Sequence, residues 1–183
     1  SASGDAPAKA VPVTGPTGPL TDGLRAVIFD MDGVIIDSEP LHEQAFLDVF
    51  EEMGYGQTHG VHFPDYYGRS DEALWEDFVR RHRPSQPFTA LMAMKRRRLI
   101  DLIRRDQPIF EGLPDLVARL AARFPLAVAS GSPHPVIDEV LAMEGLHRFF
   151  NAVVSVTDVG RPKPAPDVFL RAAELLGMAP GEC

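Results

Sequence analysis

A short apolar run that ends in two aspartates and a glycine, Val27 to Gly33, constrains the fold more than any other segment of this chain. Its first three residues are β-branched or aromatic and uncharged, which is typical of a buried β-strand. Because side chains alternate along an extended chain, Asp30 and Asp32 should project in roughly the same direction beyond the strand. Gly33 then permits a sharp turn. An Asp-Gly turn explains the same residues without any function, so this segment alone leaves both interpretations open.

The rest of the chain predicts an α/β fold, a Rossmann-like parallel sheet core with an inserted α-helical cap domain. Two more buried runs, Leu126–Ala129 and Ala152–Val156, alternate with helical patterns, and this alternation is typical of a parallel sheet. Between the first strand and residue 108 the apolar residues recur at helical spacing instead. We expect a flexible tail over residues 1–22 and a core domain formed by residues 23–38 and 108–183. The helical cap is expected to cover residues 39–107.

Apolar periodicity, together with helix-capping residues, also locates the helices. Ser70 is expected to cap the second of them and Ser132 the fifth. The expected spans are residues 39–53, 71 through 78, about 89–106, about 113–124, 133–141 and 166–176.

Composition narrows the choice of partners. The 183 residues carry a formal net charge of −8, which argues against nucleic-acid binding, and no apolar run is long enough to cross a membrane. Residues 1–22 lack the basic start and apolar stretch of a secretory signal. The single Cys183 has no partner within the chain, which excludes an internal disulfide and a cysteine zinc site. A cytoplasmic location fits these features, and the oligomeric state stays open.

Three separate segments suggest chemistry. The two aspartates after the first strand form a hard oxygen site suited to Mg²⁺, which would relieve their repulsion. Ser130 and Gly131 end the second strand and open a helix, where a hydroxyl and N–H groups bind anions, although a simple helix cap is the plainer explanation. Lys163 lies among prolines after the third strand. It is either a stiffly held charge suited to phosphate or an ordinary solvated lysine.

Taken in this order, the three segments resemble the haloacid dehalogenase superfamily of phosphohydrolases. The most similar branch contains beta-phosphoglucomutase and related sugar-phosphate phosphatases. The resemblance covers roughly residue 24 to the end of the chain, and it rests on the stretches Phe29–Glu39, Val128–Ser132 and Lys163–Asp167.

The resemblance implies a Mg²⁺-dependent phosphatase that acts on a small phosphorylated metabolite such as a sugar phosphate. Asp30 would be the nucleophile that forms an aspartyl phosphate, and Asp32 would be the general acid and base. The Asp30 carboxylate and the Asp32 main-chain carbonyl would hold Mg²⁺. Ser130 and the Gly131 N–H would bind phosphate oxygens, and Lys163 would neutralise charge. The helical cap would close over the site and exclude water.

The resemblance also points to His42 and Arg69 in the cap. His42 matches a position that faces the substrate in the mutase branch, with a surface histidine as an equal alternative. The segment Tyr67–Asp71 matches the cap specificity loop of the family. The mutase has a lysine and an arginine where this chain has Tyr67 and Asp71, and Arg69 lies elsewhere in the loop. This difference favours a phosphatase over a phosphomutase.

The family has a fourth motif, an acidic pair on a further strand, which completes the Mg²⁺ shell and normally follows a segment like Gly177–Cys183. We therefore expect a chain truncated before this motif, which binds Mg²⁺ poorly and turns over slowly or not at all. A non-catalytic phosphate-binding protein is then a third hypothesis beside a phosphatase and a phosphomutase.

Basic residues gather on the third predicted helix, in Lys95–Arg98 and at Arg104 and Arg105. They are expected to form a solvated face, with steering of anionic substrates as the alternative. Trp75 is expected to lie in the apolar core.

Overall fold

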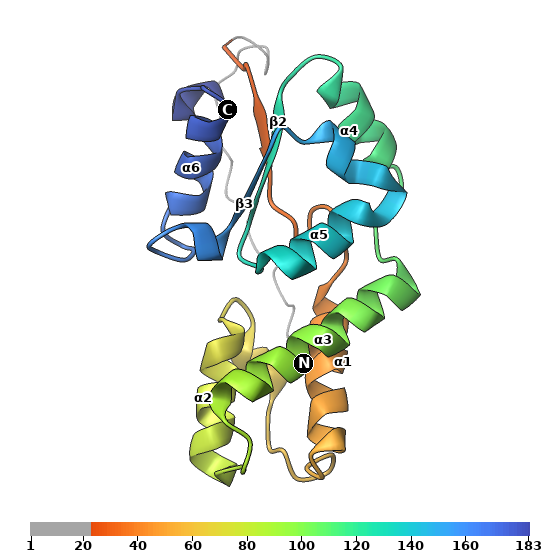
Figure 1. Cartoon of the computed structure of the whole chain (residues 1–183), viewed down its shortest axis with the longest axis vertical. Coiled ribbons are helices and arrows are strands. Elements are labelled where there is room, and N and C mark those ends of the chain that lie inside the picture. The colour runs from red at the N-terminus through yellow and green to blue at the C-terminus, as the bar shows by residue number, and fades with distance from the viewer. Residues whose placement is uncertain (1–22) are drawn as a thin grey trace, which may run out of the picture.

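The computed structural model describes residues 23–183, which form two lobes stacked along the long axis of the molecule (Figure 1). One lobe contains the β-sheet, and the other is built of helices over residues 39–106. The chain leaves the sheet lobe after its first strand and returns before its second, so the α-helical cap is inserted into the core as predicted. The predicted tail, residues 1–22, lies outside the described residues. We keep residues 39–107 as the proposed extent of the cap.

The sheet is three-stranded and parallel. Its strands, in the spatial order β1-β2-β3, are Val27–Phe29, Leu126–Ser130 and Ala152–Ser155. Phe29 pairs with Val128, and Ser130 pairs with Ser155, so the carboxyl ends of all three strands meet at one edge of the sheet.

Two strand boundaries differ by one residue from the sequence prediction. β2 includes Ser130, which pairs with β3. β3 ends at Ser155 because the Ser155 Oγ accepts the N–H of Thr157 and starts a short 3-10 helix. Side-chain hydrogen bonds of this kind compete with the strand ladder.

Helices cover both faces of the sheet. α4 and α5 lie on one face and α6 lies on the other (Figure 1). Their bounds are Leu113–Ala121, His134–Ala142 and Asp167–Leu175. Successive residues of β2 alternate between the two faces: Ala127 and Ala129 pack in the cluster of α6, while Leu126 and Val128 pack in the cluster of α4 and α5. The sheet is therefore buried on both sides, as parallel sheets are.

Three helices and several 3-10 segments complete the structure. The cap helices α1, α2 and α3 are Glu39–Glu52, Asp71–His82 and Phe88–Asp106. The 3-10 segments η1 to η4 are Phe63–Tyr66, Met143–Phe149, Val156–Asp158 and Pro180–Glu182. The Ser70 Oγ caps α2 by accepting the N–H of Ala73, as predicted.

The cap has its own aromatic core. Trp75 is fully buried, as expected, and its ring centroid lies 5.3 Å from that of Phe46 and 5.5 Å from that of Phe50. Phe50 stacks on Phe78 at 4.9 Å. Aromatic pairs at such distances each contribute roughly 0.5–1.5 kcal/mol beyond area burial. These contacts hold α1 and α2 together.

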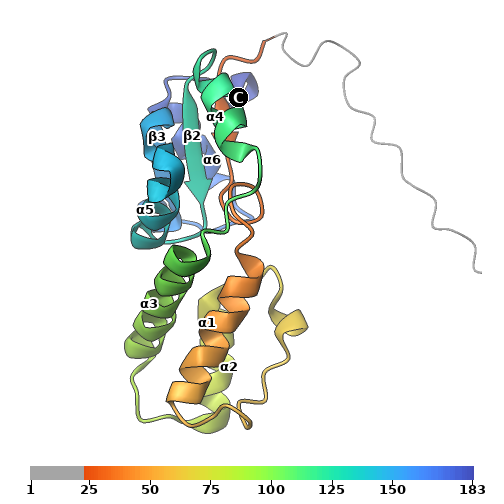
Figure 2. The ribbon, with the colours of Figure 1, turned by 90° about the vertical axis from the view of Figure 1, so that its right-hand side faces the viewer.

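The two connections between the lobes run side by side. Ile36 and Ile109 form an antiparallel bridge, the Asp37 N–H donates to the Pro108 carbonyl at 2.9 Å, and the Phe110 N–H donates to Ile35. The long helix α3 reaches from the cap to the sheet lobe, where it packs near α5 (Figure 2). This arrangement places the start of α1 over the carboxyl edge of the sheet.

Candidate active site

The first aspartate, Asp30, follows β1 directly at the carboxyl edge of the sheet, where open α/β folds bind ligands. Its Oδ1 accepts the Met31 N–H at 2.7 Å and lies 2.8 Å from the Lys163 ammonium. Lys163 also donates to the Ala129 carbonyl at 3.2 Å and lies 4.8 Å from the centre of the Phe169 ring. The structure thus brings together a carboxylate and an ammonium from opposite ends of the sequence.

Ser130 and Gly131 lie beside this pair at the end of β2. Ser130 is fully buried, and its Oγ accepts the N–H of Ser132 at 3.0 Å. Gly131 is exposed, with nothing near the position that a Cβ would occupy. The open backbone at Gly131 therefore leaves room for an anion to approach the chain closely.

The second aspartate, Asp32, lies in a dense hydrogen-bond network. Its Oδ1 accepts from the Ser38 hydroxyl at 2.6 Å and lies 3.2 Å from His42 Nε2, and its Oδ2 accepts from the Ser132 hydroxyl at 3.2 Å. Burial raises the pKa of this carboxyl, but the hydrogen bonds from His42, Ser38 and Ser132 outweigh it and lower the pKa from 3.8 to about 2. Asp32 is therefore held as a carboxylate at neutral pH.

The network continues into the cap through His42 on α1. His42 Nδ1 lies 2.6 Å from the ammonium of Lys95 on α3, and Lys95 donates to Asp71 at 2.6 Å. An ammonium only donates hydrogen bonds, so Nδ1 must accept and Nε2 must carry the hydrogen that points to Asp32. A continuous chain of contacts thus links Asp32 of the core to Asp71 at the start of α2.

Lys95 contradicts the prediction of a solvated basic face. Its side chain is only 2% exposed, and its ammonium lies 4.7 Å from the centre of the Phe46 ring. Burial lowers the pKa of Lys95, and the Asp71 carboxylate opposes that shift. The sequence held a signal for this burial, because Lys95 lies four residues from both Leu91 and Leu99 on the apolar face of α3. Arg96 and Arg97 on the same helix are exposed, as expected.

The prediction that Ser132 caps α5 is also wrong. Pro133 is the N-cap residue, and the Ser132 hydroxyl donates to Asp32 instead. Ser38, at the N-cap of α1, likewise makes no side-chain cap hydrogen bond and donates to Asp32. Both hydroxyls thus hydrogen-bond to Asp32 and do not cap the N-terminus of a helix.

Arg69 lies in the loop between η1 and α2, and its side chain is half-exposed. Its guanidinium is 3.9 Å from Asp77 and 5.0 Å from the centre of the Tyr66 ring. Arg69 lines two cavities between the lobes, one of about 460 Å³ and one of about 410 Å³, and both also include Asp32, His42 and Asp71. We call the larger the cap cavity, since it extends along α1 and η1, and the smaller the core cavity, since it extends to Gly131 and the start of α5.

Within residues 23–183 no group of three or more histidine, cysteine or acidic side chains is arranged to hold a metal ion. Hard oxygen donors are present in Asp30 and in the main-chain carbonyl of Asp32. Mg²⁺ commonly binds through one or two carboxylates and keeps several waters, so this donor set suits it. In the same part of the chain, no helix is both long and apolar enough to cross a membrane.

Comparison with known proteins shows the family of this chain. Residues 24–183 match the family of haloacid dehalogenase-like hydrolases, and the chain belongs to that family. It is 34% identical to hexitol phosphatase B of Escherichia coli (strain K12) over 164 residues, which cover 87% of this chain and 73% of that protein. It is 32% identical to the fructose-1-phosphate phosphatase YqaB of the same strain over 169 residues, covering 90% and 86%.

A solved structure shows the same fold. CbbY from Rhodobacter sphaeroides, in complex with xylulose-1,5-bisphosphate, superposes with a TM-score of 0.73 at 22% identity, over 85% of this chain and 73% of that one. Together, the family and the two phosphatase relatives identify the chain as a phosphoric monoester hydrolase.

Proposed function

We propose that this protein is a Mg²⁺-dependent phosphatase that hydrolyses a small phosphorylated metabolite, of the sugar- or polyol-phosphate class, through an aspartyl phosphate on Asp30. The observation that carries this proposal is the contact of Asp30 with Lys163 at 2.8 Å, next to a second carboxylate that accepts hydrogen bonds from Ser38, His42 and Ser132. A cytoplasmic location belongs to the same proposal.

Asp30 supplies the nucleophile in this scheme. A carboxylate oxygen of Asp30 attacks phosphorus while the bond from phosphorus to the ester oxygen breaks. Lys163 faces the same carboxylate, so its charge offsets the repulsion between Asp30 and the incoming phosphate. The contacts of Lys163 with the Ala129 carbonyl and the Phe169 ring hold the ammonium in place.

Asp32 is the residue that transfers the proton in this scheme. In the first step it gives a proton to the departing ester oxygen. In the second step water attacks phosphorus, the bond from phosphorus to the Asp30 oxygen breaks, and Asp32 takes a proton from that water. Its pKa of about 2 keeps it deprotonated at neutral pH, which is the form needed to take a proton. The negative charge of a bound phosphate raises the pKa of a neighbouring carboxyl, which favours the protonated form needed in the first step.

The Asp30 carboxylate and the Asp32 main-chain carbonyl would hold Mg²⁺. When bound, the ion would neutralise charge on the phosphate oxygens. The cap supplies the walls that exclude water from the remainder of the site, and His42 orients Asp32 from the cap side.

The test is phosphate release from a panel of phosphorylated sugars and polyols, with and without Mg²⁺, for the natural sequence and Asp30→Asn. The expected rate is low, because these 183 residues do not include the fourth motif, and whatever release occurs should need both Mg²⁺ and Asp30. Circular dichroism of Asp30→Asn checks that the variant is folded. Release that persists in Asp30→Asn would overturn the proposed nucleophile, and efficient isomerisation of a hexose phosphate without net release would indicate a phosphomutase instead.

A further inference from the structure

The cap cavity lies next to the proton-transfer residue, and its lining is acidic. Asp32 lines both cavities, and the core cavity reaches Gly131, where the reacting phosphate would bind. On the proposed function, the non-reacting end of the substrate therefore extends into the cap cavity. Three further carboxylates, those of Asp37, Glu39 and Glu43, line the cap cavity. Within residues 23–183 none of these three side chains makes a hydrogen bond or an ion pair, unlike Asp71, which binds Lys95.

Of the two cations Lys95 and Arg69 near the cap cavity, only Arg69 lines it. The Lys95 ammonium is buried and contacts Asp71 and His42. The Arg69 guanidinium lies near Asp77 and over the Tyr66 ring. The carboxylates in the lining of the cap cavity outnumber Arg69, so a second phosphate placed there would meet mainly like charges.

The other side chains of the cap cavity are aromatic. Phe46, Phe63, Tyr66 and Tyr67 line it together with the carboxylates. Aromatic faces with nearby acids suit the C–H faces and hydroxyls of a polyol, and they also suit an ammonium group. Among the described residues, Arg69 is the one arginine or lysine side chain in this lining.

We infer that the cap cavity selects phosphomonoesters whose non-reacting end carries no second negative charge, with Glu43 as a specificity-determining residue. Glu43 is half-buried on the first turns of α1, next to His42, whereas Asp37 and Glu39 are more exposed. Charge repulsion is stronger where solvent screening is weaker. This chain would thus discriminate against bisphosphates of the kind held by CbbY.

The test compares fructose 1-phosphate with fructose 1,6-bisphosphate, which share one phosphate ester and differ by a second phosphate. Binding is measured by calorimetry in the Asp30→Asn background with Mg²⁺ at low salt, so that no turnover is needed. We expect the bisphosphate to bind at least about tenfold more weakly. In the double variant Asp30→Asn/Glu43→Gln, the ratio of the two affinities should shrink by about threefold or more. The substitution removes one repelling charge and keeps the shape of the side chain.

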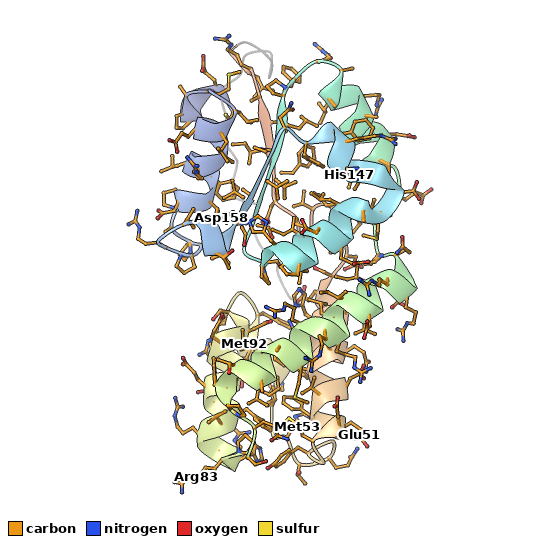
Figure 3. The ribbon with its side chains drawn as sticks, in the orientation of Figure 1. Glu51, Met53, Arg83, Met92, His147 and Asp158 are labelled. Atoms are coloured by element: carbon orange, nitrogen blue, oxygen red, sulfur yellow. The ribbon has the colours of Figure 1, made fainter. Side chains whose placement is uncertain are left out.

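The matched control is Glu51→Gln. Glu51 lies on the same helix at the end of the cap farthest from the sheet (Figure 3), outside the lining of both cavities. Glu51→Gln should leave the difference in affinity between the two compounds unchanged. Without the Glu43 substitution, raising the salt concentration should also narrow the difference in affinity between the two compounds. Screening weakens charge repulsion and leaves a steric barrier unaltered.

Equal binding of the two compounds, or a difference that neither salt nor Glu43→Gln changes, would overturn the inference. If the compounds bind with the expected preference but the natural sequence releases no phosphate from any monoester, the proposed function fails and the selectivity stands. If phosphate is released while binding shows no preference, only the selectivity fails. Absence of binding by both compounds would overturn both.

Discussion

The two lobes use their lysines in different ways. In the sheet lobe, Lys163 is 28% exposed and contacts an aspartate that is 39% exposed, at the edge where a ligand would arrive. In the cap, the Lys95 side chain is 2% exposed and contacts His42 and Asp71. The comparison separates a charge that is available to a ligand from a charge that supports the protein's own network. Removing each lysine should therefore have a different consequence.

The largest effect is expected from Lys163→Met. The variant keeps the apolar stem and loses the charge that faces Asp30, so kcat/KM should fall by about 100-fold or more, because charge neutralisation is a main source of phosphoryl-transfer catalysis. The measurement is steady-state phosphate release, with Lys163→Arg as the charge-conserving control. A loss of less than about threefold would place Lys163 outside the reaction.

A smaller effect is expected from Lys95→Met. The change removes a buried cation, and His42 loses the donor that fixes its ring, so kcat should fall by about tenfold while KM changes little. Stability should fall by about 1–3 kcal/mol, because the change removes only one partner and leaves the partly exposed Asp71 carboxylate without its cation. Kinetics and urea denaturation measure both quantities. A collapse of stability with normal kcat in the folded fraction would contradict a positioning role.

The hydrogen bonds of Asp32 predict a dependence of stability on pH. Its folded pKa, about 2, lies below the ordinary value of 3.8, so its contribution is complete above about pH 4 and is lost as the pH falls toward 2. One third of this side chain is exposed, which limits the contribution to about 1–2 kcal/mol. Urea denaturation between pH 6 and pH 2, with Asp32→Asn as reference, measures it. A stability difference between the two proteins that stays constant over this range would show that the carboxylate is not stabilised.

The smallest effect is expected from Phe169→Leu. The Phe169 ring lies 4.8 Å from the Lys163 ammonium, and loss of this exposed cation–π contact should lower kcat/KM about two- to threefold. Phe169→Tyr keeps an aromatic face and should restore the rate. If leucine and tyrosine behave alike, the ring does not position the lysine.

Short segments whose role follows from local pattern were predictable. β1 begins and ends where the uncharged apolar run predicted, and Trp75 is buried as expected. The prediction was wrong where a side chain has two possible partners. Ser132 has the sequence of a helix cap, yet it donates to Asp32, which lies 100 residues earlier in the chain. Only the packing of β1 against β2 brings those two residues together.

The sequence by itself determined the order of strands and helices and the insertion of the cap, because apolar periodicity and turn chemistry act between near neighbours. The resemblance of its motifs to those of a known family indicated the family. The tertiary structure decided which charged side chains are exposed to a ligand or solvent. Lys95 and Arg96 are adjacent and alike in sequence, and the packing of α3 against α1 buries the first and exposes the second. Burial and pairing of charges depend on which surfaces meet, and that information lies in contacts between residues far apart in the chain.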